Sequence, residues 1–551
     1  MDCVADCQGL PIRLREDVEA LGARLEKDNA LATSGSERRG RLERAAELYE
    51  VVAKRYGGYY SWINAATLRL LSGDTLGARR LAEHARILVA ADGDDTVGGY
   101  WRRATEAEAA LILGDDRAAR DAIGRAASAS GRDFAARAVT YRQLRLVCAA
   151  AGLDEEVLGA LAPPSVLHYC GHRIDELGAP GRFPATLEHQ VAEQVRDFFG
   201  HRDLGLGYGS LASGADILVA EALLSVGADL HVVLPFGRDE FERTSVAPAG
   251  SAWVSRFAVC LDRAASVTYA SDSAYLGRDE LFGYAARIAM GHAVNRARFL
   301  DTEAQQLAVW DGAPAAGVAG TAHDVQVWRD TGRPAHVIPL PNQAQNATPA
   351  SPSEPTRACE VRAIIFTDLR GFSRLRDEHF PPFVDQVLGP LGHVLDRYSP
   401  AILSRNSWGD AVAAVCADVI VAAECALGFQ DALAALDLAA IGLPHDLGLR
   451  IGAHAGPVMP IVDPIRRDLA YWGRELTRAA RIEPRTPEGE VYVTDAFAAL
   501  LALEHSVPFI TEYVGRVTTA KDFETIPMYR LRRKRGRIES TTDAPCSFSP
   551  S

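Results

Sequence analysis

Two segments in the last third of the chain each place an aspartate at one end of an apolar run, with a glycine within three residues of it. The first runs from Ile364 to Ser373 and contains Asp368; the second, Ser407–Asp410, precedes the apolar residues 411–415. A β-sheet built from such segments would hold Asp368 and Asp410 side by side at its edge. Because carboxylate oxygens suit hard divalent cations, the pair predicts a site in which two metal ions bind a triphosphate.

The length, composition and charge of the chain limit its class. At 551 residues it predicts three or four domains, and 48% hydrophobic with 24% charged residues is typical of a soluble globular protein. A formal net charge of −13 disfavours nucleic acid or an anionic membrane as a partner, since both prefer a basic surface.

The apolar runs and the cysteines indicate where the protein resides. No apolar run approaches the roughly 20 residues of a membrane span, and residues 1–13 lack the basic start and apolar core of a signal peptide. The nine cysteines are an odd number and include no Cys-x-x-Cys pair, which predicts reduced thiols. We therefore expect a cytoplasmic protein without a membrane span.

Residues 1–160 are rich in Ala, Leu and Arg with helical spacing. Turn signals at 72–74, 113–115 and 151–154 recur at intervals of about forty residues, close to the length of a helix-turn-helix repeat. The pattern predicts an α-solenoid whose concave face binds a partner or a ligand, and a plain helical bundle is the alternative.

Two aromatic segments of this region, Tyr59–Ala66 and Tyr100–Ala109, resemble tetratricopeptide-like repeats, most closely those of the TRAFs-binding type. The resemblance implies that the helices stack into a repeat domain. A protein partner at these helical repeats is the interaction that such a domain would serve.

Residues 164–340 contain short β-like runs separated by helical stretches, which predicts a Rossmann-like α/β domain with a mostly parallel sheet. A glycine-bearing turn, Leu206–Gly214, opens onto a helix that begins at Ala215, so that backbone N–H groups would approach a phosphate. A single turn of this kind is a weak sign, because many glycine turns serve only the backbone. The β-like runs include 166–169, 230–234 and 335–338.

Later in the same region, Trp310–Gly312 and Gly320–Thr321 supply a second turn and a second helix start. With the first turn they resemble the SLOG domains, which are Rossmann-like sensors of nucleotides and nucleotide sugars. The resemblance implies a small nucleotide at the carboxyl ends of the strands; a purely structural domain is the alternative. His172 is either a further ligand contact or a structural hydrogen-bonding residue. The expected ligand contacts are Gly209, Ser210, Gly214, Gly320 and Thr321.

The last part of the chain is bounded by two segments of biased composition. Residues 341–357, rich in Pro, Ala, Ser, Asn and Gln, predict a linker, and residues 533–551 predict a disordered tail. Between them, residues 358–532 alternate strands and helices in the order β-α-β-β-α-β. This order predicts an α+β domain with a ferredoxin-like core.

Four motifs in residues 358–532 resemble the catalytic domain of class III nucleotide cyclases. The resemblance implies that Asp368 and Asp410, with the backbone carbonyl of Leu369, bind two Mg²⁺ or Mn²⁺ ions per site. It also implies that the ribose 3′-hydroxyl attacks the α-phosphate, that pyrophosphate leaves, and that Arg481 stabilises the developing charge. The motifs are Phe366–Ser373, Gly409–Asp410, Arg450–Val458, and Trp472–Gly473 with Arg481 eight residues later.

Three positions depart from the pattern of the cyclases that act on purines. Asn406 stands where those enzymes have lysine, Ala470 where they have aspartate or threonine, and Thr477 where they have the asparagine that precedes Arg481. Either the site reads another base, or the alignment shifts by a residue or two, or the enzyme is degenerate. The two metal aspartates and Arg481 argue against a degenerate enzyme, and missing base contacts change selectivity strongly.

The residue beside the second aspartate bears on which base is read. Trp408 in the segment Arg405–Asp410 resembles the pyrimidine cyclases of bacterial anti-phage defence, which make cyclic UMP or cyclic CMP. We therefore expect UTP to be converted to cyclic UMP, with Arg405, Asn406, Trp408 and Ala470 as candidates for base recognition. Core packing of Trp408, and a surface carboxylate as the partner of Arg405, are the alternatives.

In this family the metal ligands and the arginine come from different subunits, so a homodimer of this chain would form two complete sites. The N-terminal domains would then control the geometry of the dimer. An adenylate or guanylate cyclase of bacterial signalling is one alternative function, and a non-enzymatic nucleotide-binding scaffold is another.

Overall fold

The computed structural model divides the chain into two compact units. The first comprises Met1–Pro164 with Arg296–Glu303, and the second comprises Ser165–Asn295 with Ala304–Ser551. The predicted linker, apart from Pro341, lies outside the described residues. The structure describes residues 12–92, 99–179, 181–272, 275, 277, 279–314, 319–341, 359–504, 508–522 and 524–534.

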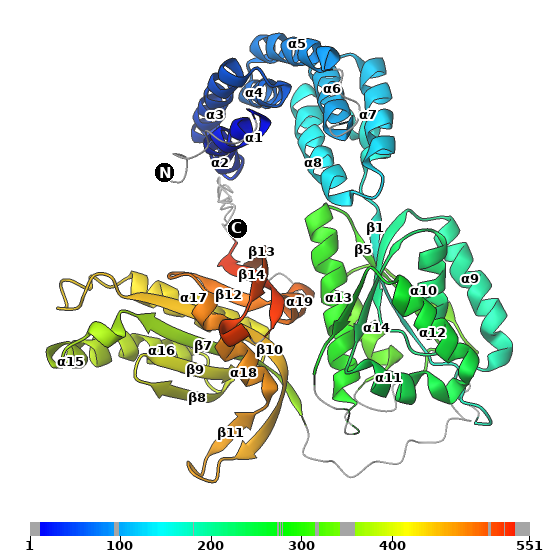
Figure 1. The fold of residues 1–551 in the computed structure, drawn as a ribbon, viewed down its shortest axis with the longest axis vertical. Helices are drawn as coiled ribbons and strands as arrows, with labels where there is room; N and C mark the ends of the chain where they lie inside the picture. The colour runs from blue at the N-terminus through cyan, green and yellow to red at the C-terminus, as the bar shows by residue number, and fades with distance from the viewer. Residues whose placement is uncertain are drawn as a thin grey trace, which may run out of the picture. The chain divides into compact units, whose positions relative to one another are not determined.

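The first unit is helical (Figure 1), which confirms the helical character predicted for the N-terminal region. Its arrangement as an α-solenoid stays a prediction. Among the described helices of the whole chain, none combines the length and the hydropathy that crossing a membrane requires. The helices are α1 (Ile12–Glu19), α2 (Leu21–Leu31), α3 (Gly35–Tyr56), α4 (Tyr59–Ser72), α5 (Thr75–Ala91), α6 (Gly99–Leu113), α7 (Asp116–Ser130), α8 (Phe134–Ala151) and the 3₁₀ helix η3 (Glu155–Leu161).

The turn signals of the sequence separate successive helices by the same local device. Gly73 ends α4 in the left-handed conformation, and the Asp74 side chain then accepts a hydrogen bond of 2.8 Å from the first turn of α5. Gly114 and Asp115 repeat this between α6 and α7, with a hydrogen bond of 3.0 Å. Glycine permits the positive φ and aspartate satisfies an unpaired N–H group, so the dipeptide both stops one helix and starts the next.

The second unit begins with a six-stranded sheet in which every pairing is parallel. The strand order is β4-β3-β2-β1-β5-β6, so the chain moves outward from β1 and then returns to its other side. A reversal of this kind is where open α/β sheets bind ligands. The strands are β1 (Ser165–Gly171), β2 (Leu204–Gly209), β3 (Asp229–Leu234), β4 (Ser266–Tyr269), β5 (Ala304–Trp310) and β6 (Ala335–Pro339).

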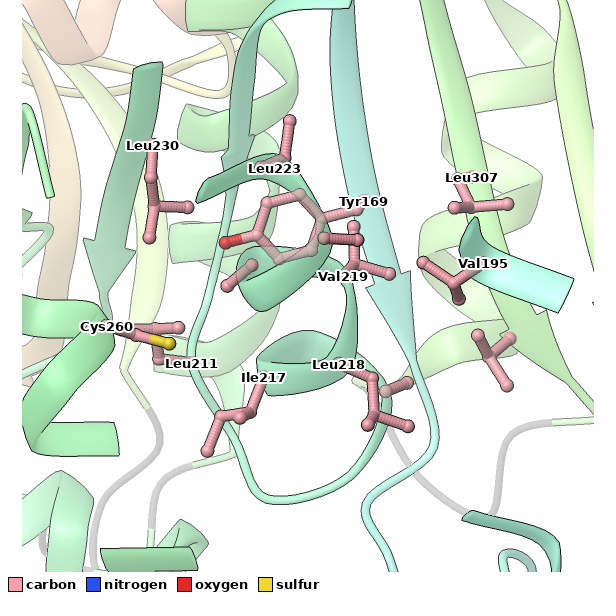
Figure 2. Close-up of a cluster of buried hydrophobic side chains, with 14 of the residues drawn as sticks. Tyr169, Val195, Leu211, Ile217, Leu218, Val219, Leu223, Leu230, Cys260 and Leu307 are labelled. Carbon is pink, nitrogen blue, oxygen red and sulfur yellow. The ribbon is translucent and has the colours of Figure 1, made fainter. Parts of the chain in front are cut away.

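Helices pack on both faces of this sheet, because alternate side chains of β1 point in opposite directions. Tyr169 lies in a large apolar cluster with Val195 and Cys260 from the helices of one face (Figure 2). His168 points to the other face and stacks on Trp328, with 5.4 Å between the ring centroids. The helices are α9 (Glu188–Gly200), α10 (Ala215–Ser225), α11 (Arg238–Ser245), α12 (Ser251–Arg263), α13 (Glu280–Leu300) and α14 (Thr321–Asp330).

The second sheet of this unit has eight strands, seven of them in the order β13-β14-β12-β10-β7-β9-β8, with β11 paired to β10. The central strands β7 and β10 are antiparallel. The elements are β7 (Glu360–Arg370), α15 (Phe380–Phe383), the π-helical segment η8 (Val384–Leu388), α16 (Gly389–Arg397), β8 (Ile402–Trp408), β9 (Ala411–Cys416), α17 (Val419–Ala434), β10 (Gly448–Val462), β11 (Leu469–Trp472), α18 (Arg474–Ile482), β12 (Val491–Thr494), α19 (Asp495–Leu503), β13 (Phe509–Thr518) and β14 (Thr525–Arg533).

The observed order contains the predicted β-α-β-β-α-β succession, with two differences at its ends. Asp368 lies inside β7 rather than after it, because the long strand β10 supplies backbone partners as far as Arg370. Arg533 closes β14 opposite Phe509 and is therefore ordered, although the sequence places it in the tail. Residues 535–551 of the predicted tail lie outside the described residues.

Candidate active site

The two aspartates predicted to bind metal lie close together, near the end of the central strand β7. Asp368 is on β7, and Asp410 is in the turn between β8 and β9. Gly409 adopts the left-handed conformation in this turn, with φ of 65°, which favours glycine there. Burial raises the pKa of Asp410, and both the charge of Asp368 and a hydrogen bond between the two carboxyl groups raise it further.

Two crowded carboxyl groups are a suitable donor set for divalent ions, since a cation relieves their repulsion. Within the described parts of the chain, no cluster of three or more His, Cys, Asp or Glu side chains is arranged to hold a metal ion. An ion at Asp368 and Asp410 would therefore need phosphate or water oxygens to complete its coordination. Mg²⁺ commonly binds in this way, through one or two carboxylates and the substrate's phosphates.

Two charged residues that the sequence analysis gave no role complete this group. Arg450 of β10 pairs with Asp368, and its Nε atom lies 2.9 Å from a carboxylate oxygen of Glu483. Glu483 is 8% exposed, and burial raises its pKa to about 7, opposed by Arg450 and assisted by the charges of Asp368 and Asp410. Arg450 therefore holds one candidate metal ligand in place while Glu483 limits the net positive charge.

The other predicted catalytic residues lie in a different pocket of the same domain. Thr477 and Arg481 are four residues apart on α18, so they share one face of the helix. Both line a pocket of about 440 Å³ with Lys521, whose cation the sequence analysis missed. Neither Asp368 nor Asp410 lines this pocket. The pocket that holds the candidate phosphate-binding cations is thus lined by neither candidate metal ligand.

Three of the four base-recognition candidates meet in an adjacent pocket of about 330 Å³. Asn406, Trp408 and Ala470 line it, and it shares Phe366 and Leu476 with the pocket of Arg481. Trp408 is 58% exposed, so it does not pack in the core of this chain.

Arg405, the fourth candidate, does not line this pocket. It forms an ion pair of 2.5 Å with Asp396, which corresponds to the surface-carboxylate alternative. Arg405 differs from Asn406 in this respect because neighbouring residues of β8 point to opposite faces of the sheet.

Three of the five predicted ligand contacts of the parallel sheet line a common pocket, and the other two do not. Ser210, Gly320 and Thr321 line a pocket of about 450 Å³, together with His172 and Asp216. His172 is also hydrogen-bonded at 2.9 Å to Asp311, which fits the alternative that it is a structural hydrogen-bonding residue.

Two of the predicted glycines are outside this pocket and have packing roles. A side-chain carbon at Gly209 would overlap the ring of Tyr169. One at Gly214 would overlap the backbone at Ile174, and its φ of 100° favours glycine in any case.

The carboxyl of Asp216 makes the stability of this domain depend on pH. Asp216 is 7% exposed, and burial raises its pKa to about 7. An unfolded aspartate ionises near pH 4, so the folded form loses stability as pH rises from about 4 to about 7, with no further loss above that. D216N should therefore melt several degrees above wild type at pH 8 and much closer to it at pH 5, a difference on the order of 1–3 kcal/mol. Differential scanning calorimetry at both pH values tests this, and a constant difference would contradict it.

One family model matches the C-terminal domain. Residues 355–526 match the model described as the adenylate and guanylate cyclase catalytic domain. Comparison with the curated proteins finds no relative of this chain.

Solved structures of cyclase domains are similar to about a third of the chain. The adenylyl cyclase CyaB from P. aeruginosa is 18% identical, with 32% of this chain and 97% of that chain covered, at a TM-score of 0.28. The guanylate cyclase domain of RhGC from Catenaria anguillulae, in complex with GTP, is 16% identical over 32% and 98% of the two chains, at a TM-score of 0.28. An adenylate cyclase from Trypanosoma brucei is 20% identical over 33% and 92%, at a TM-score of 0.26.

The family match covers β7, the turn with Asp410, β10 and α18, which are the elements that carry the two groups of candidate catalytic residues. The C-terminal domain of this protein is a nucleotide cyclase catalytic domain of the adenylate and guanylate cyclase type, and the protein is accordingly an enzyme of the nucleotide cyclase class.

Proposed function

We propose that this cyclase converts UTP to 3′,5′-cyclic UMP and pyrophosphate. The observation that carries the proposal is the pocket of Asn406, Trp408 and Ala470, which holds a neutral amide and a methyl group at the positions where purine cyclases carry charged or hydroxyl groups. The test offers ATP, GTP, CTP and UTP separately with Mn²⁺ and identifies the cyclic product by mass. Cyclic AMP or cyclic GMP as the main product would instead favour an adenylate or guanylate cyclase.

In the proposed reaction each group of residues has a separate task. Asp368, Asp410 and the carbonyl of Leu369 would hold two Mg²⁺ or Mn²⁺ ions, and Arg450 keeps Asp368 in place. The ions, when bound, neutralise the triphosphate and lower the pKa of the ribose 3′-hydroxyl. Arg481 and Lys521 bind phosphate oxygens and stabilise the charge that develops at the α-phosphate, and Thr477 orients the ribose.

If no triphosphate gave a cyclic product, that result would favour the alternative of a non-enzymatic nucleotide-binding scaffold.

A homodimer would unite the two groups, because Asp368 and Asp410 lie outside the pocket of Arg481. A set of exposed apolar side chains, three of which line the base pocket, supports an interface there. Its members come from β8 and from the hairpin of β10 and β11, and they are solvent-exposed in one chain. Apolar patches of this kind mark protein–protein contacts. They are Trp408, Val462, Ile465, Leu469 and Trp472.

The base pocket yields a prediction about selectivity. The double substitution N406K with A470D restores the charged pair expected of purine cyclases, and it should raise the ratio of ATP to UTP turnover by about tenfold or more, since base selection depends on hydrogen bonds to edge groups. Competition between the two triphosphates, with both cyclic products measured together, gives this ratio directly. N406A is the matched control, because it removes the amide without adding a charge; it should lower turnover without favouring ATP. An unchanged ratio in the double variant would place base recognition elsewhere.

We further propose that the cyclic nucleotide is a second messenger of anti-phage defence in the bacterial cytoplasm. The pocket of Ser210 and Thr321 in the SLOG-like domain would take a small nucleotide, and the helical repeats would bind a protein partner. Support comes from the combination of a cyclase domain with a ligand-sized pocket at the strand-order reversal of the parallel sheet. Cells that express the protein should accumulate cyclic UMP after phage infection and not before it. A constant level would contradict a defence role.

A further inference from the structure

One helix of the second unit borders both the pocket of the parallel sheet and the cyclase domain. Ala285 and Ala289 of α13 are one turn apart and line the pocket. On another face of α13, the hydroxyl of Tyr284 donates a hydrogen bond of 2.7 Å to the carbonyl of Ala455 in β10. Tyr284 and Ala455 are 2% and 1% exposed, so this contact is buried.

The contact between α13 and the cyclase domain continues along the helix. A side-chain carbon at Gly291 would overlap the backbone of Ala499 in α19, so the two helices approach as closely as glycine allows. One turn further, the Asn295 amide donates a hydrogen bond of 3.1 Å to the carbonyl of Ala498. A helix packed so closely on one side passes a displacement on the other side to its neighbour, because packed interfaces shift as units.

A second connection reaches α18, the helix that carries Thr477 and Arg481. Asp272, three residues before the pocket-lining Tyr275, lies 2.9 Å from Nη2 of Arg478 and 3.5 Å from Nη2 of Arg474. Both arginines belong to α18. Asp272 thus fixes the catalytic helix from outside the cyclase domain.

Arg478 is well placed to pass this contact on. It is 12% exposed in its side chain and also binds Glu524 at 2.6 Å and Glu475 at 2.7 Å. Glu475 is hydrogen-bonded at 2.8 Å to His454, which adjoins Ala455, the acceptor of the Tyr284 hydroxyl. The two connections therefore converge on the junction of β10 and α18. Asp272 is exposed, and an isolated exposed ion pair contributes little, but its partner Arg478 belongs to a largely buried network with Glu475 and His454.

We propose that the pocket beside α13 is a regulatory site, and that its occupancy changes the position of α18 through the Tyr284–Ala455 contact and the Asp272–Arg478 ion pair. The inference rests on the proposed cyclase function, which it extends to the control of Arg481. The ligand class that fits is a phosphorylated small molecule with an apolar portion. Arg173, Arg182 and Thr321 supply cationic and hydroxyl groups, and α13 supplies an apolar wall.

The test uses the full chain and fills the pocket by substitution, so no ligand needs to be identified. Ala286 also lines the pocket, and A286W places an indole there. Hydrogen exchange of residues 474–482 is measured in wild type and in A286W, and again in a D272N/Y284F background that lacks the Asp272 ion pair and the Tyr284 hydrogen bond. A286W should change the exchange rate of α18 between about twofold and thirtyfold in the first background and by a clearly smaller factor in the second, where the packing at Gly291 and the Asn295 hydrogen bond remain.

D272N alone provides the kinetic test and needs no core substitution. It should lower kcat by about twofold to thirtyfold with little change in KM, because Asp272 positions α18 and does not touch the substrate. D262N is the matched control. Asp262 is an exposed aspartate on α12, a helix that packs on the parallel sheet, and D262N should leave kcat and α18 exchange at wild-type values.

The outcomes separate this inference from the cyclase proposal, because hydrogen exchange does not require turnover. If no triphosphate is cyclised but A286W changes α18 exchange by a clearly larger factor when Asp272 and Tyr284 are intact, the function fails and the coupling stands. If turnover is present but A286W acts equally in both backgrounds or in neither, the coupling is overturned.

Discussion

Replacing Asp410 or Asp368 with asparagine is expected to reduce cyclic nucleotide formation by at least about a thousandfold, the largest effect of any single substitution in this chain. Asparagine keeps the size of the side chain but removes the negative charge that a divalent ion requires. Among the described residues, no third His, Cys, Asp or Glu side chain joins Asp368 and Asp410 to compensate for the loss. Product is measured by mass spectrometry with Mn²⁺ and the triphosphate that wild type uses best.

The fold of these variants should survive, since the crowding of the two carboxyl groups raises the pKa of Asp410 and its loss relieves repulsion. Unchanged melting temperatures would show that any loss is catalytic. D396N is the matched control: Asp396 is exposed, pairs with Arg405, and lines neither pocket. It should retain near wild-type turnover. Product formation by D410N at the wild-type rate would remove the metal assignment.

The placement of the aspartates could be anticipated because it depends on local pattern. An apolar run with an aspartate and a glycine at one end predicts a strand with a polar residue near its end, and the two runs pair in one sheet. The same reasoning explains why Asn406 and Trp408 share a pocket while Arg405 does not, since a strand alternates its faces. The sequence alone did not show which face of β8 would border the pocket.

Glu483 and Lys521 could not be found in the same way. Glu483 looks like an ordinary charged residue after a helix, and only the packing of α18 against β10 buries it beside Arg450. Lys521 lies between β13 and β14, far from Arg481 in sequence, and it joins the pocket of Arg481 only when those strands pair. Both depend on long-range contacts, which sequence periodicity does not encode.

The glycines of the parallel sheet are a case in which the sequence pattern suggested ligand binding but the residues serve packing. Gly209 and Gly214 fit a phosphate-binding turn by their spacing, but each is required by contact with the protein itself. A glycine that allows close approach reads the same in sequence whether the approaching group is a ligand or a neighbouring strand. The structure distinguishes the two by what a side-chain carbon would touch.

The second large effect concerns a site divided between two subunits. D368N and R481A should each abolish most activity when present in both subunits. A heterodimer with D368N in one subunit and R481A in the other should recover about half of the wild-type rate. In that dimer one site carries both substitutions, while the other combines the intact aspartates of one subunit with the intact arginine of the other. Co-expression with two affinity tags, followed by sequential purification, isolates this species for assay.

The half-activity result depends on where the residues of one site come from. If Asp368 and Arg481 of the same chain formed a site, each site of the heterodimer would carry one substitution and activity would stay near zero. The separation of the two groups in a single chain favours the first arrangement, because the pocket of Arg481 includes neither aspartate. The same dimer with R405A in place of R481A is the control. Since Arg405 pairs with Asp396 and lies outside both pockets, it should keep one intact site in either arrangement.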